Sequence, residues 1–191
     1  MSARPLGELR IIGGQWRSRR VAFEAADGVR PTPDRVRQTL FDWLAPRIEG
    51  ARCLDLFAGS GALGLEALSR GAAQVRFVDS GRAQMARIGE ALQRLGATDR
   101  AELHAGDALA ELSRPGNGRY DIVFLDPPYG SDLLERALPR VPGVLAADAR
   151  VYVEWPDDAR PDLPPDCAWV REKSAGRVSF GLFTHEQGSR A

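Results

Sequence analysis

Residues 52–64, RCLDLFAGSGALG, constrain the fold of this chain more strongly than any other segment. An apolar run that ends at Phe57 leads directly into Gly59, Gly61 and Gly64, and a helix-forming stretch follows. This order predicts a strand, a tight turn and a helix, with the glycines spaced as G-x-G-x-x-G. Such a turn lets the backbone approach a bound nucleoside or dinucleotide closely. The same glycines could serve only the packing of the turn, so their spacing alone does not establish a binding site.

The rest of the chain repeats the same alternation of strand and helix. We expect strands at 52–57, 74–78, 101–105, 122–125 and 150–154, and helices near 62–70, 81–95, 107–112 and 131–140. Strands that alternate with helices form a parallel sheet that is covered on both faces. A last pair of strands, 169–172 and 178–183, would add an antiparallel hairpin at the sheet edge. The fold class is therefore α/β and Rossmann-like, with a mostly parallel seven-stranded sheet that ends in an antiparallel hairpin.

The first 40 residues carry a positive charge that the net charge of zero for the whole chain conceals. This segment holds eight arginines against four acidic residues, so it has a net charge of +4 and the remainder has −4. Residues 9–12 and 16–23 predict a small β-hairpin that turns at Gly13-Gly14. A basic extension on an acidic body suits a polyanionic partner, although arginines on a solvated surface would give the same count.

A helix is expected to follow this hairpin. Thr32 is a plausible N-cap, Pro33 suits the first turn, and Pro46 would end the helix. The buried stripe of this helix would consist of Val36, Leu40, Phe41 and Leu44, which recur at helical spacing.

The remaining composition excludes several classes of protein. Cys53 and Cys167 are the only cysteines, and His104 and His185 are the only histidines, so no Cys/His metal cluster can form and no metal is expected. No apolar run approaches the roughly 18 residues that would span a bilayer, and the N-terminus lacks the apolar core of a secretory signal. We therefore expect a cytoplasmic protein with no membrane partner.

Three aspartates distinguish between the possible ligands of the glycine turn. Asp55, Asp79 and Asp107 each fall at the carboxyl end of a predicted strand, and these ends share the edge where open α/β sheets bind ligands. Asp55 would face the pyrophosphate of a dinucleotide, and two like charges in a crevice disfavour each other. S-adenosylmethionine instead brings an ammonium and a sulfonium, which a carboxylate attracts. Asp79 would accept hydrogen bonds from the ribose, and Asp107 would accept one from the adenine amino group. Both residues could instead serve only as helix N-caps.

The strand at 122–125 runs into the tetrapeptide Asp126-Pro127-Pro128-Tyr129. The two prolines stop the strand and hold Asp126 rigidly at the sheet edge. An exocyclic amine of a nucleic-acid base is a poor nucleophile, and hydrogen bonds to Asp126 and to a prolyl carbonyl would orient its lone pair towards a methyl group. The carboxylate would also stabilise the positive charge that develops on the nitrogen. Tyr129 offers a flat face on which an extruded base can stack.

These segments resemble one known family. The tetrapeptide is similar to that of amino-methyltransferases that act on nucleic acids and on some proteins. The segments RIIGGQWRSR (10–19), RPTPDRVR (30–37), LDLFAGSGALGLEALSR (54–70) and REKSAG (171–176) resemble the bacterial RsmD family over nearly the whole chain. One departure is that the family often has Glu at the position of Asp79.

The resemblance implies an enzyme that transfers a methyl group from S-adenosylmethionine to the N2 amine of a guanine in 16S rRNA, within the small ribosomal subunit, and releases S-adenosylhomocysteine. On this interpretation the catalytic residues are Asp126, Pro127, Pro128 and Tyr129. The donor site would consist of Asp55, Phe57, Gly59, Gly61, Asp79, Asp107 and Ala108. Candidate RNA contacts are Arg10, Trp16, Arg17, Arg19, Arg30, Arg35 and Arg37. Trp16 could equally be a core anchor.

The resemblance also implies a domain organisation. Residues 1–40 would form an N-terminal hairpin and helix extension for RNA contact, 41–186 the methyltransferase domain, and 187–191 a tail. The chain is expected to be a monomer, because the sequence shows no further apolar seam.

Three other functions are compatible with parts of the pattern. A DNA adenine-N6 methyltransferase shares the tetrapeptide, but it normally carries a larger region for reading duplex sequence. A nicotinamide oxidoreductase shares the glycine turn, yet Asp55 and the tetrapeptide argue against it. A non-catalytic RNA-binding module would need neither the glycine turn nor the tetrapeptide.

Overall fold

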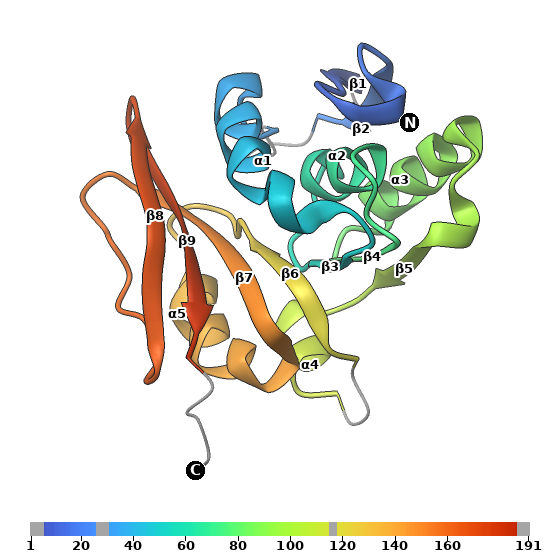
Figure 1. Ribbon diagram of the computed structural model, residues 1–191. Helices are drawn as coiled ribbons and strands as arrows, with labels where there is room; N and C mark the ends of the chain where they lie inside the picture. The colour runs from blue at the N-terminus through green and yellow to red at the C-terminus, as the bar shows by residue number, and fades with distance from the viewer. Residues whose placement is uncertain (1–5, 26–30, 115–117, 187–191) are drawn as a thin grey trace.

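A seven-stranded sheet runs through the molecule in the order β5-β4-β3-β6-β7-β9-β8 (Figure 1). The structure is a computed structural model, and it describes residues 6–25, 31–114 and 118–186. The parallel strands are β3 (Arg52–Asp55), β4 (Gln74–Asp79), β5 (Ala101–Ala105), β6 (Tyr120–Leu125) and β7 (Leu145–Pro156). The antiparallel strands are β8 (Cys167–Ala175) and β9 (Val178–His185). The parallel α/β sheet with a terminal hairpin is thus confirmed.

Helices cover both faces of this sheet. One face carries α1 (Asp34–Ile48), α2 (Ala62–Ser69) and α3 (Arg82–Leu95), and the other carries α4 (Ala108–Leu112), α5 (Leu133–Ala137) and the 3₁₀ helix η3 (Leu138–Val144) (Figure 1). A short 3₁₀ turn, η2 (Thr98–Arg100), precedes β5. Successive side chains of a strand point to opposite faces, so Phe124 joins the apolar core under α1 while Val123 and Leu125 join the second core. The two cores hold the sheet rigid and fix its carboxyl edge.

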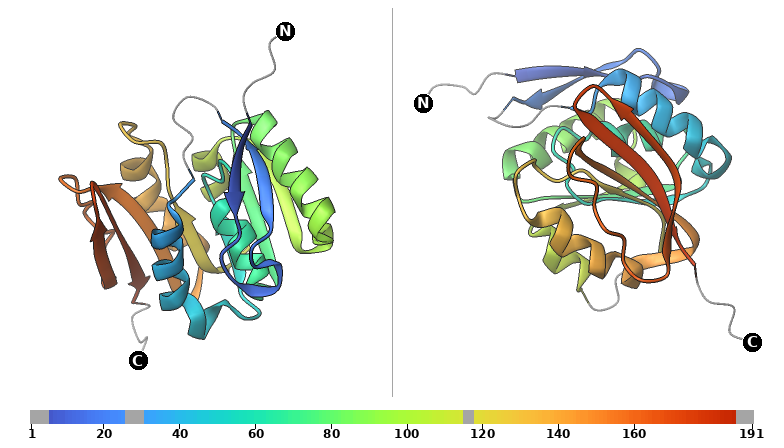
Figure 2. Two further views of the ribbon diagram at one scale, coloured as in Figure 1. Left: turned by 90° about the horizontal axis from the view of Figure 1, so that it is seen from above. Right: turned by 90° about the vertical axis from the view of Figure 1, so that its left-hand side faces the viewer.

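The N-terminal hairpin forms a separate two-stranded sheet. Strands β1 (Leu6–Arg10) and β2 (Arg20–Glu24) pair antiparallel, and η1 (Gly14–Trp16) lies in the loop between them. Its apolar side chains Leu9, Val21 and Phe23 are buried in the same core as α1, α2 and α3. Figure 2 shows the hairpin lying across the helices rather than extending the main sheet. The extension is therefore packed firmly onto the body.

The hairpin loop differs from the expected glycine turn. The paired strands end at Arg10 and begin again at Arg20, so the loop is much longer than the two residues Gly13-Gly14. Two α2 side chains hold this loop. Glu66 accepts hydrogen bonds from the N–H groups of Ile12 (2.9 Å) and Gly13 (2.8 Å), and Ser69 Oγ accepts one from the N–H of Trp16 (3.0 Å). These contacts require an open loop, which overrides the local preference of the two glycines.

The ends of α1 also differ from the prediction. Pro33 rather than Thr32 is the N-cap residue, and the Thr32 side chain makes no cap hydrogen bond. Pro46 does not end the helix, which continues to Ile48 because that side chain is buried in the core. Strand β7 begins at Leu145, five residues before the expected start, while the expected helix at 131–140 is shorter and gives way to η3.

Candidate active site

The glycine turn joins β3 to α2 at the carboxyl edge of the sheet. Gly59 and Gly61 have φ angles of 50° and 77°, a region that side chains with a Cβ rarely adopt. The N–H of Gly61 donates to the carbonyl of Ala58 across 2.6 Å, which closes the turn. The backbone thus takes the sharp path that the sequence predicted and leaves the start of α2 facing the edge.

Two of the predicted donor-site aspartates hold this turn in place. Asp79, at the end of β4, accepts hydrogen bonds from the N–H of Gly59 (2.8 Å) and of Gly81 (2.7 Å). Asp55, at the end of β3, is 2% exposed and accepts one from the N–H of Gly64 across 2.9 Å. Burial raises the pKa of Asp55 to about 7, and the nearby Asp79 adds to this rise while the Gly64 N–H opposes it. Asp55 is therefore a buried acid that a bound cation would help to ionise.

The remaining donor-site candidates lie along the same edge. Asp107 is the N-cap of α4, and its Oδ1 accepts a hydrogen bond from the N–H of Ala110 across 2.7 Å. Ala108 is the first residue of α4 and is buried, while Phe57 is half-buried beside the second core. The structure thus brings together the carboxyl ends of β3, β4 and β5. Asp107 is exposed, and its Oδ2 makes no hydrogen bond within the described residues, so capping leaves it able to accept from a ligand.

Asp126 lies where β6 ends, one strand away from Asp55. Its Oδ2 accepts a hydrogen bond from the Thr32 hydroxyl across 3.2 Å, which connects the catalytic candidate to the start of α1. Burial, followed by the negative charge of Glu154, raises the pKa of Asp126 well above its ordinary value, and the Thr32 hydroxyl opposes this rise. The next residue, Pro127, is buried, whereas Pro128 and Tyr129 are exposed. The tetrapeptide therefore presents a fixed carboxylate beside an accessible ring.

Glu154, near the end of β7, was not singled out from the sequence. It is 5% exposed and accepts hydrogen bonds from the hydroxyls of Tyr129 and Tyr152, the latter across 2.9 Å. Burial, the hydrogen bond to Glu154 and the charge of that carboxylate raise the pKa of Tyr129, so its hydroxyl stays a donor. Glu154 thus fixes the position of the exposed Tyr129 ring through the hydroxyl group of that ring.

A cavity of about 700 Å³ adjoins the tetrapeptide. Its lining includes Pro127, Pro128, Tyr129 and Glu154, together with residues of α5, of η3 and of the segment that follows β7. Clefts of roughly 300–1,000 Å³ are typical of sites for small molecules, so the cavity has room for a nucleotide.

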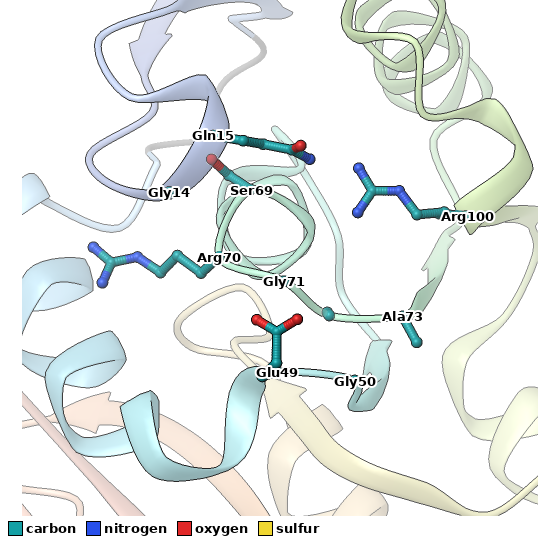
Figure 3. A pocket seen from close by; sticks show the side chains of 10 residues that line it. Gly14, Gln15, Glu49, Gly50, Ser69, Arg70, Gly71, Ala73 and Arg100 are labelled. Carbon is teal, nitrogen blue, oxygen red and sulfur yellow. The ribbon is translucent and has the colours of Figure 1, made fainter.

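A second cavity, of about 540 Å³, lies between the hairpin loop and the C-terminal end of α2 (Figure 3). Glu49 points towards Gly71 from the end of α1, and Arg70 and Arg100 lie on either side. This cavity is at the edge of the sheet where β3 and β4 begin, opposite to the aspartates. It belongs to the junction of the hairpin with the body.

Comparison with known proteins assigns the chain to a family. The family model described as Conserved hypothetical protein 95 matches residues 9–184. Ribosomal RNA small subunit methyltransferase D of Escherichia coli (strain K12) is 44% identical over 183 residues, which cover 94% of this chain and 91% of that protein. The protein of the same name from Haemophilus influenzae is 40% identical, with 93% of this chain and 94% of that protein covered. The chain belongs to the RsmD family.

Solved structures agree with this assignment. The Escherichia coli protein yhhF superimposes with a TM-score of 0.85 at 44% identity, covering 94% of this chain and 99% of that one. The fold also matches SMU.776, solved in complex with SAH, with a TM-score of 0.72 at 12% identity over 96% of this chain and 57% of that one. The Rossmann-like methyltransferase fold predicted for this RsmD-family chain is thus confirmed.

The candidate RNA contacts of this RsmD-family chain divide into two groups. Arg17, Arg19 and Arg35 are exposed, and Arg10 is exposed while paired with Asp34 across 2.9 Å. Arg30 lies outside the described residues. Arg17 and Arg19 follow η1, which is tied to the end of α2 remote from the glycine turn. These two arginines therefore lie at the opposite end of α2 from the glycine turn.

The structure corrects the prediction for Arg37. Its side chain is 1% exposed and donates to the carbonyls of Thr32 (3.0 Å) and Arg10 (2.9 Å), while Glu66 lies 3.5 Å away. A guanidinium buried in this way cannot contact RNA. Its hydrogen bonds instead stabilise the start of α1. Arg37 is a structural residue that links the hairpin to α1.

Trp16 is also placed in the core rather than at an RNA surface. It is 5% exposed and its ring lies under the Arg100 guanidinium, 5.3 Å from the ring centroid. Of the two roles left open by the sequence, the core anchor is the one that this burial supports.

Among the described residues, no group of three His, Cys, Asp or Glu side chains is arranged to hold a metal ion. None of the described helices is both long and apolar enough to cross a membrane.

Proposed function

We propose that this chain transfers a methyl group from S-adenosylmethionine to the exocyclic N2 amine of a guanine in 16S rRNA of the small ribosomal subunit. The observation that carries the proposal is the placement of Asp126 and Tyr129 at the same sheet edge as Asp55, Asp79 and Asp107. The names of the Escherichia coli and Haemophilus influenzae relatives support the choice of small-subunit rRNA.

The residues at this edge fit the charges of the proposed donor. S-adenosylmethionine supplies an electrophilic methyl group on a cationic sulfonium, together with an ammonium, and no phosphate. Asp55 is buried where the glycine turn begins, and its carboxylate would be opposed by a pyrophosphate but stabilised by a cation. Asp79 would hold the ribose and Asp107 the adenine amino group, with Phe57, Gly59, Gly61 and Ala108 completing the wall.

Asp126 would perform two tasks in the transfer. It accepts a hydrogen bond from the exocyclic amine and so directs the nitrogen lone pair towards the methyl carbon. The C–N bond then forms as the C–S bond breaks, and the nitrogen must lose one of its two protons. Asp126 can receive this proton because burial and Glu154 raise the pKa of its carboxyl group. Pro127 would offer its carbonyl as the second acceptor, and Tyr129 would stack on the base.

The proposal extends to the remaining parts of the chain. Residues 1–40 would form the RNA-contact extension, through Arg10, Arg17, Arg19 and Arg35, and 41–186 the methyltransferase domain. A ribosomal substrate would place the reaction in the cytoplasm. The large exposed apolar side chains of the described part, Leu6, Leu103, Tyr129 and Val170, belong to different elements, which supports a monomer.

One experiment tests the proposal directly. Small ribosomal subunits from a strain that lacks its own RsmD-family enzyme are incubated with the chain and with a donor that carries an isotopically labelled methyl group. Mass spectrometry of the nucleosides of 16S rRNA should then find the label in N2-methylguanosine at a single position. Label in N6-methyl-2′-deoxyadenosine of DNA added to the same reaction, with none in rRNA, would instead support the DNA methyltransferase. No label in either would contradict both.

A further inference from the structure

Glu154 ends up beside Asp126 through the register of two neighbouring parallel strands. Phe124 pairs with Tyr152 and Leu125 with Val153, so Asp126 and Glu154 are the next residues along β6 and β7. Adjacent strands lie about 4.8 Å apart, and residues two apart on a strand face the same side. The two carboxyl groups therefore share the carboxyl edge and influence each other, as the effect of Glu154 on Asp126 shows.

Glu154 retains hydrogen-bonding capacity beside the tetrapeptide. An ionised carboxylate offers about four acceptor positions, and the hydroxyls of Tyr129 and Tyr152 occupy two of them. Glu154 is among the residues that line the 700 Å³ cavity, together with Pro127, Pro128 and Tyr129, and Asp126 directly precedes Pro127 in the chain. A base stacked on Tyr129 would therefore meet two carboxylates along one edge, Asp126 and Glu154.

The Watson–Crick edges of guanine and adenine offer different hydrogen-bonding groups to this pair of carboxylates. Guanine presents its N1–H beside the 2-amino group, so it offers two adjacent donors. Adenine presents an N1 acceptor beside its 6-amino group. Two neighbouring carboxylates disfavour each other unless donors separate them, and guanine supplies a donor to each. Adenine would set a lone pair against Glu154, and a flipped base is selected by this kind of contact.

We infer that Glu154 is a specificity residue that accepts a hydrogen bond from N1–H of the target guanine while Asp126 accepts one from the N2 amine. This inference rests on the proposed function and deepens it. The tetrapeptide alone does not distinguish guanine from adenine, and Glu154 supplies the missing distinction. The anchoring of Tyr129 by the same carboxylate keeps the stacked base in register with both acceptors.

The test uses a base that lacks N1–H. 2-Aminopurine keeps the 2-amino group but has neither the N1–H nor the O6 carbonyl of guanine, so the change of preference in a Glu154 variant, rather than the wild-type preference alone, assigns the effect to N1. Small subunits are reconstituted with 16S rRNA that carries either guanine or 2-aminopurine at the nucleotide mapped by the labelling experiment, and kcat/KM is measured for both. The wild-type chain should prefer guanine by at least about tenfold, since a hydrogen bond to a charged group contributes roughly 1.5–3 kcal/mol.

Two variants then assign the preference to Glu154. E154Q keeps the size of the side chain, and its amide can donate to the unprotonated N1 of 2-aminopurine, so the preference should fall to within about threefold. Y152F is the matched control, because it removes the other hydroxyl on Glu154 from a side chain that is 0% exposed and not part of the cavity. Y152F should keep the wild-type preference for guanine.

The outcomes separate this inference from the proposed function. A wild-type chain that methylates guanine and 2-aminopurine subunits equally well overturns the role of Glu154 and leaves the proposed function standing. An unchanged preference in E154Q does the same. If E154Q does not fold, as circular dichroism would show, equal wild-type rates on the two kinds of subunit would still overturn the role of Glu154. A wild-type chain that methylates neither subunit would instead contradict the proposed function.

Discussion

The hydroxyl of Thr32 donates a hydrogen bond to Asp126 Oδ2 across 3.2 Å, although the two residues are 94 positions apart in the chain. Thr32 is 5% exposed, and its own carbonyl accepts from Arg37 Nε across 3.0 Å. The catalytic candidate is thus held from the start of α1, and Arg37 in turn fixes the segment that holds it. This contact leaves Asp126 Oδ1 for the amine of a substrate.

Replacing Thr32 with Val should lower kcat about tenfold, because one hydrogen bond to a charged group is lost. The affinity for S-adenosylhomocysteine should not change, and Thr32→Ser should restore turnover. The hydroxyl lowers the pKa of Asp126 against the effects of burial, Glu154 and Asp55. Its removal should therefore move the acid limb of the kcat–pH profile to higher pH, since turnover needs the ionised carboxylate. A tenfold loss without that shift would reduce Thr32 to a packing role.

Asp126 itself should be required for chemistry but not for donor binding. Asp126→Asn keeps the shape and can still accept a hydrogen bond, but it neither carries a negative charge nor receives a proton. We expect kcat to fall by roughly 10²–10³-fold, the usual cost of losing one electrostatic contact to the transition state. Calorimetry should give an unchanged dissociation constant for S-adenosylhomocysteine. Parallel losses of turnover and donor affinity would mean that Asp126 is structural.

Thr32 and Asp126 also show which features of the site could be predicted from the sequence and which could not. The strands and the glycine turn follow from local patterns, namely apolar runs that end at Gly, Asp or Pro, and so does the rigid tetrapeptide. Thr32 fits a helix N-cap by every local rule, yet its hydroxyl serves a residue 94 positions away. No local signal could have revealed that contact.

The roles of Glu154 and Arg37 could not be predicted from the sequence for a similar reason. Glu154 becomes important only through the register of β7 beside β6, which the alternation of strands does not specify. The sequence places Arg37 with the exposed arginines, because arginine is rarely buried unless it is paired. Arg37 pairs with Asp34 on its own helix across 2.6 Å and with Glu66 on α2 across 3.5 Å, and the second pairing depends on how α1 and α2 pack.

Donor binding should depend on pH through Asp55. Its pKa is raised to about 7, mainly by burial, so the carboxyl group is mostly neutral at pH 5.5 and half ionised at pH 7. A cationic donor binds better to the ionised form, so affinity for S-adenosylmethionine should rise about tenfold between pH 5.5 and pH 7. The α-amino group of the donor usually titrates above this interval, so it stays charged and does not cause the change. Calorimetry at several pH values measures this. Asp55→Asn, which can still accept from Gly64, should give a flat profile; an equally steep one would exclude Asp55 as the titrating group.

The exposed arginines of the hairpin loop should contribute to subunit binding. Replacing both Arg17 and Arg19 with Glu reverses two charges and should weaken binding to small subunits at least about tenfold at moderate salt, with a shallower dependence on salt concentration. Affinity for S-adenosylmethionine should be retained, because the loop lies at the end of α2 remote from the glycine turn. Arg140→Glu, an exposed position in η3, is the matched control. Equal subunit affinity in all three proteins would argue against a hairpin that binds rRNA.

Glu66 should be the most important single residue for holding the hairpin on the body. It is 0% exposed, and it accepts from the N–H groups of Ile12 and Gly13 and from Arg70 Nε across 2.7 Å, with Arg37 nearby. Glu66→Ala would leave two part-buried N–H groups and the Arg70 guanidinium without their acceptor, and it would remove one of the two carboxylates beside the buried Arg37. The free energy of unfolding should fall by about 3–5 kcal/mol, or roughly 10 °C in Tm.

The matched control for this last prediction is Glu90→Ala. Glu90 pairs with Arg87 across 2.9 Å but is 45% exposed, so its loss should cost at most about 1 kcal/mol. Chemical denaturation measures both changes, and limited proteolysis should find faster cleavage in the hairpin loop of Glu66→Ala alone. If the two variants lose similar small amounts, the apolar side chains Leu9, Val21 and Phe23 hold the hairpin without help from Glu66. Arg37 would still connect the hairpin to Thr32 through its hydrogen bonds to the carbonyls of Arg10 and Thr32. Glu66 of α2 would then contribute little to holding these contacts in place.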